Sequence, residues 1–528
     1  MNTLLLAGGL LYDGSGSAPF EADILLGDGK ILRVEPAGKV RFPGAEIRNL
    51  NGCSVSPGWI DVHAHSDASL LAAPEAFGKI SQGITAEVSG NCGLSAFPIC
   101  TGEVREHLRT LYSVYDLDPD WTDFASYAER LERARPAVNA VFLCGHNTLR
   151  ANVSGYSRRD LPPEALAEMN RLLSLQLRQG AAGISTGLLY TPGCFAGEPE
   201  LLSLLRTAAA HNGVYATHLR SEGDKLEEAL QEAVTLAEQA RITLQVSHLK
   251  TALPRNWHKL DSVLKIIAGA RSRGVDLHAD RYPYTASQTS LSIVLPAPFD
   301  TMTDAAIRNL LQTDPAARKQ ALDLLVTSGR DWSRVILSRT GAKTGGNLVG
   351  MNLADAASKA GKTPAALVVE LLAEDAPGTL GAFSGMSEDN LKRILAQDWV
   401  CCGTDETARP ADHSLGRSHP RGFGSFPRFI RLLREQNVPM AEIVRRLTSL
   451  PARIFRLAGR GMVRPGMSAD LVVFDEAVLA SAADFRQPHA PADGIRQVFV
   501  NGVPAYDGPA KKVTARAGRV LRRMAFPA

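Results

Sequence analysis

Short strand-like segments alternate with helical patterns through the long middle of the chain. The strand candidates are residues 59–65, 84–90, 137–146, 181–188, 213–220, 243–250, 274–284 and 399–405. Helical patterns fill most of the gaps, for example over residues 164–180 and 225–240. Eight strand–helix units are the number that a closed (β/α)8 TIM barrel requires. The alternation therefore predicts an α/β fold built around such a barrel.

The two ends of the chain have a different texture, with short strands separated by glycine turns. Residues 1–57 and 459–528 share this pattern, which predicts one small β-domain formed from both termini. The barrel then occupies residues 58–458. The stretch between positions 284 and 399 is longer than any single crossover connection, so we expect a subdomain inserted after the seventh strand, at about 285–345.

The composition is that of an ordinary globular protein of 528 residues, 45% of them hydrophobic. A net charge of +3 gives no basis for binding nucleic acid or an acidic membrane surface. The seven cysteines form no disulfide framework, no apolar run is long enough to span a membrane, and the N-terminus lacks the basic residues of a signal peptide. We expect a cytoplasmic protein that binds a small-molecule substrate and neither nucleic acid nor membranes.

Side chains that bind metal ions lie at the ends of several predicted strands. They are His63 and His65 on the first strand, Cys92 after the second, His218 and His248 on the fifth and sixth, and Asp405 on the last. Residues two apart in a strand face the same side, so both His63 and His65 should point into the barrel mouth. Imidazole, thiolate and carboxylate are the ligand types that suit zinc. A single histidine at a strand end is usually structural, but the whole set predicts a zinc site.

Longer sequence motifs extend this pattern to a known family. GWIDVHAHSD resembles the opening metal motif of the amidohydrolase superfamily. SGNCGLSAFP, GHNTLR, GISTGLLYTPG, ATHLRSE, VSHLK, GTD and HPRGFGSFPR follow in order, and together they resemble the D-aminoacylase (N-acyl-D-amino-acid deacylase) family. The resemblance runs from about residue 5 to about residue 502. It implies zinc-dependent hydrolysis of the amide bond of N-acyl-D-amino acids, giving a D-amino acid and a carboxylate.

The resemblance also implies how the metal ligands divide. Cys92, His218 and His248 match the family's tight zinc site. His63, His65 and Asp405 match a second, weaker metal position that shares Cys92. Asp405 further matches the general base, which takes a proton from the attacking water and passes it to the departing amine. We therefore expect one tightly bound zinc and a weaker second divalent ion.

Four further residues are implied to hold the substrate. Lys250, Tyr282 and Arg421 match positions that bind the substrate's α-carboxylate, a task that suits a lysine, a phenol and a guanidinium. Tyr190, in LLYTPG, is a candidate hydrogen-bond partner of the scissile carbonyl. The segment that follows Tyr282, residues 283–299, contains no basic side chain, which argues against substrates with an acidic side chain.

Two other functions stay open at this point. One is another amidohydrolase, cleaving a cyclic amide or a dipeptide. The other is a non-catalytic barrel that binds a metabolite; it predicts a broken ligand set, whereas the set in this sequence is intact. A panel of substrates separates the enzyme functions, whereas the tertiary structure decides whether the predicted ligands come together.

Overall fold

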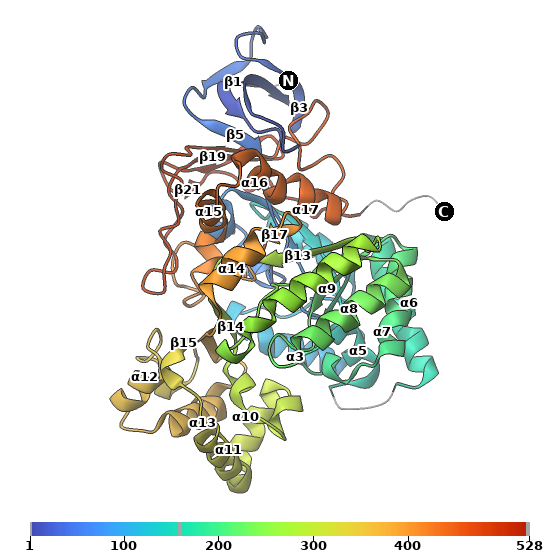
Figure 1. Cartoon of the computed structure of the whole chain (residues 1–528), viewed down its shortest axis with the longest axis vertical. Coiled ribbons are helices and arrows are strands. Elements are labelled where there is room, and N and C mark those ends of the chain that lie inside the picture. Colours follow the sequence, from blue (N-terminus) through green and yellow to red (C-terminus); the bar gives the residue numbers. More distant parts are fainter. Residues whose placement is uncertain (1–2, 157–160, 524–528) are drawn as a thin grey trace.

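A ring of parallel strands forms the centre of the computed structural model, which describes residues 3–156 and 161–523 (Figure 1). The strands are β6 (Trp59–Asp61), β7 (Ile84–Ser89), β8 (Asn139–Phe142), β9 (Cys144–Gly145), β10 (Gly183–Gly187), β11 (Val214–His218), β12 (Thr243–Val246), β13 (Leu277–Arg281) and β17 (Val400–Cys402). β8 and β9 are one strand interrupted at Leu143. The pairing runs β6–β7–β8 and then β9–β10–β11–β12–β13–β17, and a bridge between Ala64 and Glu406 links the last strand to the first. The predicted (β/α)8 barrel is confirmed.

Helices cover the outside of the ring. They are α1 (Ser69–Ala72), α2 (Phe77–Ile80), α3 (Gly102–Tyr112), α4 (Phe124–Ala134), α5 (His146–Ser154), α6 (Pro163–Gln179), α7 (Glu198–Ala210), α8 (Leu226–Ala240), α9 (Leu260–Ser272), α14 (Glu388–Leu395), α15 (Arg421–Arg434), α16 (Met440–Leu447) and α17 (Ser449–Ile454). α8 packs on the ring through an apolar stripe, because Leu230, Val234 and Ala237 recur at helical spacing and are buried. None of the described helices is long and apolar enough to cross a membrane.

Strands from both ends of the chain form one nine-stranded sheet. They are β1 (Thr3–Leu11), β2 (Phe20–Gly27), β3 (Lys30–Pro36), β4 (Glu46–Asn49), β5 (Ser54–Pro57), β18 (Leu471–Phe474), β19 (Ile495–Val500), β20 (Val503–Asp507) and β21 (Lys512–Val513). The antiparallel pairing of β5 with β18 joins the two halves. The N-terminal strands of this sheet, drawn in blue in Figure 1, lie at one end of the long axis. The exact domain boundaries near residues 58 and 458 stay a prediction.

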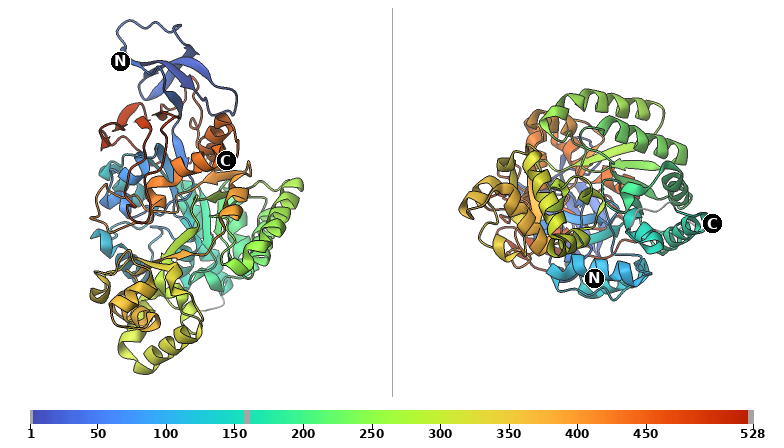
Figure 2. Two further views of the ribbon diagram at one scale, coloured as in Figure 1. Left: turned by 60° about the vertical axis from the view of Figure 1, so that its left-hand side comes forward. Right: turned by 90° about the horizontal axis from the view of Figure 1, so that it is seen from below.

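The segment between β13 and β17 forms a subdomain at the opposite end of the long axis (Figure 2). It contains β14 (Ala286–Ser290), α10 (Asp304–Thr313), α11 (Pro315–Thr327), β15 (Val335–Arg339), α12 (Leu353–Lys359), α13 (Pro364–Asp375) and β16 (Leu380–Ser384). Its separate apolar core runs from Leu291 to Ala376, beyond the expected end near residue 345. α12 and α13 have the apolar periodicity of barrel helices, so the pattern alone cannot assign them to the insertion.

Candidate metal centre

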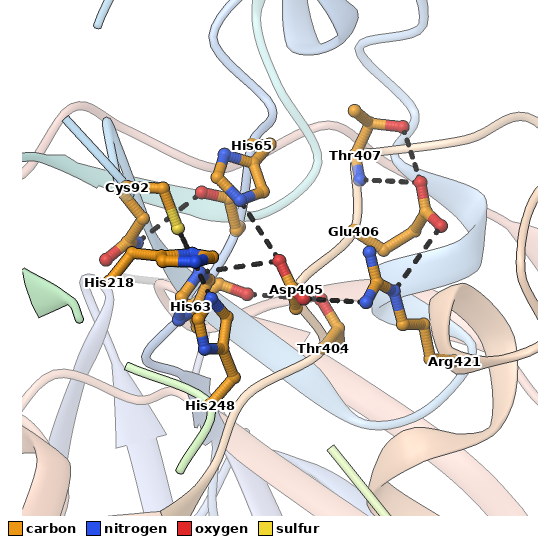
Figure 3. A network of polar contacts seen from close by, with 12 residues as sticks. His63, His65, Cys92, His218, His248, Thr404, Asp405, Glu406, Thr407 and Arg421 are labelled. Carbon is orange, nitrogen blue, oxygen red and sulfur yellow. Dashed lines mark hydrogen bonds and ion pairs between the residues drawn. The ribbon is translucent and has the colours of Figure 1, made fainter. Parts of the chain in front are cut away.

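The six predicted ligands meet at the C-terminal ends of the barrel strands (Figure 3). Their donor atoms form three overlapping groups, each with all atoms within 4.8 Å of one another. The groups are His63, His65 and Cys92; Cys92, His218 and His248; and His63, His248 and Asp405. The second group is the expected tight site, and the other two contain the ligands expected at the weaker position. The ligand set is therefore intact in space, contrary to what a non-catalytic barrel predicts.

Cys92 is the member that the first two groups share. Its Sγ lies 3.4 Å from Nε2 of His63 and 3.5 Å from Nε2 of His248. Burial opposes ionisation of the thiol, but the neighbouring imidazoles of His63 and His248 outweigh it and hold the pKa of Cys92 well below its usual value. The thiolate is the form of cysteine that binds a metal ion, so the surroundings of Cys92 favour its role as a ligand.

Three of the six ligands have a backbone conformation that is uncommon outside glycine. Cys92, His248 and Asp405 have φ values of 54°, 37° and 52°, in the left-handed region. Each such residue costs about 1–3 kcal/mol and persists only where the surrounding structure holds it. For Asp405 that hold includes a 2.7 Å hydrogen bond from its amide to the carbonyl of His63. At these three positions the strained backbone directs the donor atoms toward the centre of the ligand cluster.

A buried carboxylate, Asp280, and a half-buried one, Glu222, contact two of the histidines. Asp280 Oδ1 lies 3.0 Å from Nδ1 of His63, and Glu222 Oε1 lies 2.9 Å from Nδ1 of His248. In His63, an Nδ1–H donated to Asp280 leaves Nε2 as the free lone pair. The Nε2 atoms of both His63 and His248 face Sγ of Cys92. Sequence reasoning missed Glu222, although it stands in ATHLRSE four residues after His218. A carboxylate four residues after a predicted metal ligand is a sequence signal that could have indicated the role of Glu222.

His218 completes the test of whether this site suits a metal ion. Its ring is buried, yet neither ring nitrogen has a hydrogen-bond partner within residues 3–156 and 161–523. Buried polar atoms nearly always have a hydrogen-bond partner, so these two unpaired ring nitrogens indicate that His218 binds a ligand. The donor set comprises the thiolate of Cys92, four imidazoles and the carboxylate of Asp405. These are the ligand types of a zinc site. The residues present therefore fit zinc.

Asp405 links the imidazoles to a guanidinium. Its Oδ1 lies 3.1 Å from Nε2 of His65, and its Oδ2 accepts a 2.6 Å hydrogen bond from Nη1 of Arg421, the first residue of α15. Burial raises the pKa of this carboxyl, but the charge of Arg421 and then that of His63 outweigh it and hold the pKa well below its usual range. Asp405 is thus anionic and can accept a proton. Arg421 contacts Asp405 here in addition to the expected role at the substrate.

The remaining predicted substrate residues surround the cluster. The phenol of Tyr282 is buried and has no hydrogen-bond partner in the described part of the chain, and the guanidinium carbon of Arg421 lies 4.8 Å from its ring centroid. The Tyr190 ring centroid lies 4.9 Å from that of His218. Lys250 instead donates to Glu222, and its Nζ lies 2.8 Å from Nδ1 of His248. Tyr282 and Arg421 are therefore adjacent, and the two cations Arg421 and Lys250 each have a carboxylate partner, Asp405 and Glu222 respectively.

A buried lysine supports the site from behind. The Nζ of Lys79 donates to Asp61 Oδ2 at 2.7 Å, to Thr404 Oγ1 at 2.7 Å and to the carbonyl of Glu406 at 2.9 Å. Its side chain is fully buried and also lies 3.3 Å from Glu87 Oε2. Asp61 ends β6 two residues before His63, and Thr404 and Asp405 follow the end of β17. Lys79 therefore joins the two segments that carry His63 and Asp405.

We expect Lys79→Met to destabilise the fold strongly. The substitution keeps the approximate length of the side chain but leaves Asp61 and Glu87 buried without their cation, which costs about 3–5 kcal/mol. Chemical denaturation should report this loss in the free energy of unfolding. Lys265→Met, at an exposed position on α9, is the matched control and should change it by less than about 0.5 kcal/mol. A loss of less than about 1 kcal/mol in the free energy of unfolding of Lys79→Met would contradict the role of Lys79 in joining the segments that carry His63 and Asp405.

A (β/α)8 barrel that gathers imidazoles, a thiolate and a carboxylate at its strand ends is the architecture of a metal-dependent hydrolase. Comparison with known proteins agrees with this class. The model of the amidohydrolase family matches residues 46–331 and 351–506. The D-aminoacylase of Alcaligenes xylosoxydans xylosoxydans is 35% identical over 526 residues, covering 99% of this chain and 98% of the relative. The chain belongs to the amidohydrolase family and, within it, to the D-aminoacylase family.

Two solved structures extend the likeness to three dimensions. One is an N-acyl-D-glutamate deacylase from Bordetella bronchiseptica in complex with zinc and a phosphonate that mimics the tetrahedral intermediate. It is 30% identical with a TM-score of 0.81, and the match covers 98% of this chain and 99% of the other. The other is a D-aminoacylase with a binuclear metal centre, 32% identical with a TM-score of 0.81 over the same shares. The name of the first relative specifies a glutamate side chain, whereas that of the second specifies none.

Proposed function

We propose that this protein is a zinc-dependent hydrolase of N-acyl-D-amino acids that releases a D-amino acid and a carboxylate. The observation that carries the proposal is the position of Asp405. Its carboxylate lies between the imidazoles of His63 and His65 and the guanidinium of Arg421, beside the unpartnered phenol of Tyr282. Asp405 therefore adjoins both the metal-ligand cluster and the pair of Tyr282 and Arg421. Hydrolysis of an acylated amino acid requires a base, a metal site and a carboxylate-binding site this close together.

The residues divide the work as follows. Cys92, His218 and His248 would hold a tight zinc, and His63, His65 and Asp405 would complete a weaker second position. Zinc, when bound, polarises the scissile carbonyl and activates the attacking water.

Asp405 takes the proton of that water and later delivers it to the leaving nitrogen, which is a poor leaving group until it is protonated. Oδ2 of Asp405 accepts from Arg421, whereas Oδ1 faces the Nε2 atoms of His63 and His65 in the ligand cluster, so we assign the transfer to Oδ1.

Substrate orientation depends on Tyr282 and Arg421. Burial raises the pKa of Tyr282, but the positive charges of Lys250, Arg281 and Arg421 outweigh it and hold that pKa below its usual value. The phenol is therefore a stronger hydrogen-bond donor toward the substrate's α-carboxylate. We include Lys250 in the same clamp. When substrate binds, Lys250 exchanges its contact with Glu222 for one with the substrate's α-carboxylate. We assign Tyr190, whose ring lies next to that of His218, as the donor to the scissile carbonyl.

We expect the protein to hydrolyse N-acetyl-D-leucine or N-acetyl-D-methionine at least ~100-fold faster, in kcat/KM, than their L enantiomers. The clamp and the metal fix two points of the substrate, so only one configuration can direct its side chain into the remaining space. The assay pairs each D substrate with its L form, and elemental analysis of the same sample measures zinc. Equal rates for the two enantiomers, or turnover in protein that holds no zinc, would refute the proposed function.

The same assay tests the preference for the side chain. β14, which follows the clamp residue Tyr282, carries only the small or uncharged side chains of residues 286–290. No cation of that strand can pair a second carboxylate, so we expect N-acetyl-D-leucine to be preferred over N-acetyl-D-glutamate. A higher kcat/KM for the glutamate derivative would show that a basic residue elsewhere reaches the substrate.

A further inference from the structure

A cavity of about 160 Å³ opens beside the metal centre. On one side it is bounded by His65, by Leu94 after β7 and by Asn147 at the start of α5. On the other side its wall is one face of α3, with Leu108, Leu111 and Tyr112. His65 belongs to the ligand cluster, so the cavity adjoins the site of reaction at this residue.

The cavity and the clamp lie on different sides of the ligand cluster. Lys250 and Tyr282 follow β12 and β13, and Arg421 opens α15. The cavity instead adjoins the segments that follow β6, β7 and β9. The amide carbon of an N-acyl-amino acid carries the amino-acid half on one bond and the acyl chain on another. When the clamp holds the α-carboxylate, the acyl chain extends away from the clamp, toward the cavity.

The lining suits an uncharged chain. Within the described part of the chain, no lysine or arginine borders the cavity. Burial lowers the pKa of His107, on the α3 wall, to about 4, so this imidazole is neutral at pH 7. The carboxylate of Asp67 is occupied by hydrogen bonds from the amides of Gly90 and Ala96. Apart from the metal ligand His65, the described lining therefore offers no cation to an anionic acyl group, although the neutral polar side chains of Asn147 and Thr148 also border the cavity.

We propose that this cavity is the acyl pocket of the enzyme and that it takes a linear acyl chain of about six carbons. The inference rests on the proposed function and names the acyl class of its substrate. A cavity of roughly 150 Å³ lined by apolar side chains holds a benzene molecule, which has six carbon atoms. An acetyl group alone would leave most of the space unfilled. The preferred substrates are thus N-hexanoyl-D-amino acids and their near homologues.

The test compares N-hexanoyl-D-leucine with N-acetyl-D-leucine. Burial of each methylene contributes up to about fourfold in binding. With burial incomplete, the hexanoyl substrate should still exceed the acetyl one by at least ~10-fold in kcat/KM. Leu111→Trp places a large ring in the α3 wall and should lower the hexanoyl-to-acetyl ratio by ~10-fold or more. Thr110→Trp introduces the same ring one residue away, at a position that does not line the cavity, and should leave the ratio unchanged.

The outcomes separate this inference from the function on which it rests. Turnover of N-acetyl-D-leucine with no gain from the hexanoyl chain would overturn the acyl pocket alone. An unchanged ratio in Leu111→Trp, or an equal fall in Thr110→Trp, would also overturn it, because the preference would then arise elsewhere. A parent protein that hydrolyses neither substrate would overturn the proposed function and the pocket with it.

Discussion

Asp405→Asn should lower kcat by about 10⁴-fold or more while the fold and the tight zinc remain. The amide has nearly the shape of the carboxylate but cannot accept the proton of the attacking water. A general base typically contributes ~10²–10⁴-fold in rate, and here the same group also protonates the leaving nitrogen. The group of Cys92, His218 and His248 does not include Asp405, so the tight zinc should stay bound. Purified variant should be measured for kcat, zinc content and thermal midpoint.

The control for this experiment lies on the same loop. Asp412 is exposed, and among the described residues its carboxylate accepts only local hydrogen bonds, from the backbone and side chain of Ser414. Asp412→Asn makes the same chemical change outside the cluster and should leave kcat within about twofold of the parent. If Asp405→Asn kept kcat within tenfold of the parent with zinc retained, the proton transfer would belong to another residue.

Cys92→Ala should remove both the zinc and the activity. The thiol Sγ is within 3.5 Å of two imidazole nitrogens and belongs to two of the three ligand groups, so its loss opens both metal positions. Loss of a residue that merely orients a ligand costs ~10–100-fold in metal affinity, and loss of a ligand itself should cost more than about 100-fold. Elemental analysis after dialysis measures this independently of the assay.

Cys144→Ala is the matched comparison, since Cys144 is equally buried but lies on β9 outside every ligand group. It should retain zinc and turnover. Parental zinc content in Cys92→Ala would exclude Cys92 from the ligand set, whatever happened to the rate. Loss of zinc in both variants would indicate a general loss of folding instead.

The barrel and the choice of ligands were predictable from the sequence for local reasons. Strands that alternate with helices at regular intervals allow few architectures, and a parallel barrel brings all its C-terminal strand ends to one rim. Polar residues that follow such strands, like His218 and Asp405, must therefore lie near one another. The two-residue period of a strand adds that His63 and His65 face the same way.

Contacts between segments distant in the sequence were decided only by the tertiary structure. Glu222 contacts His248, Asp280 contacts His63, and Lys79 joins the segments that carry His63 and Asp405. Each depends on which side chain meets which across separate loops, and no local period encodes that. The same holds for the insertion, whose core reaches Ala376 through helices that resemble those of the barrel. Strand and helix periodicity acts over a few residues, whereas the partner of a buried charge or the wall of a cavity is set by packing over the whole chain.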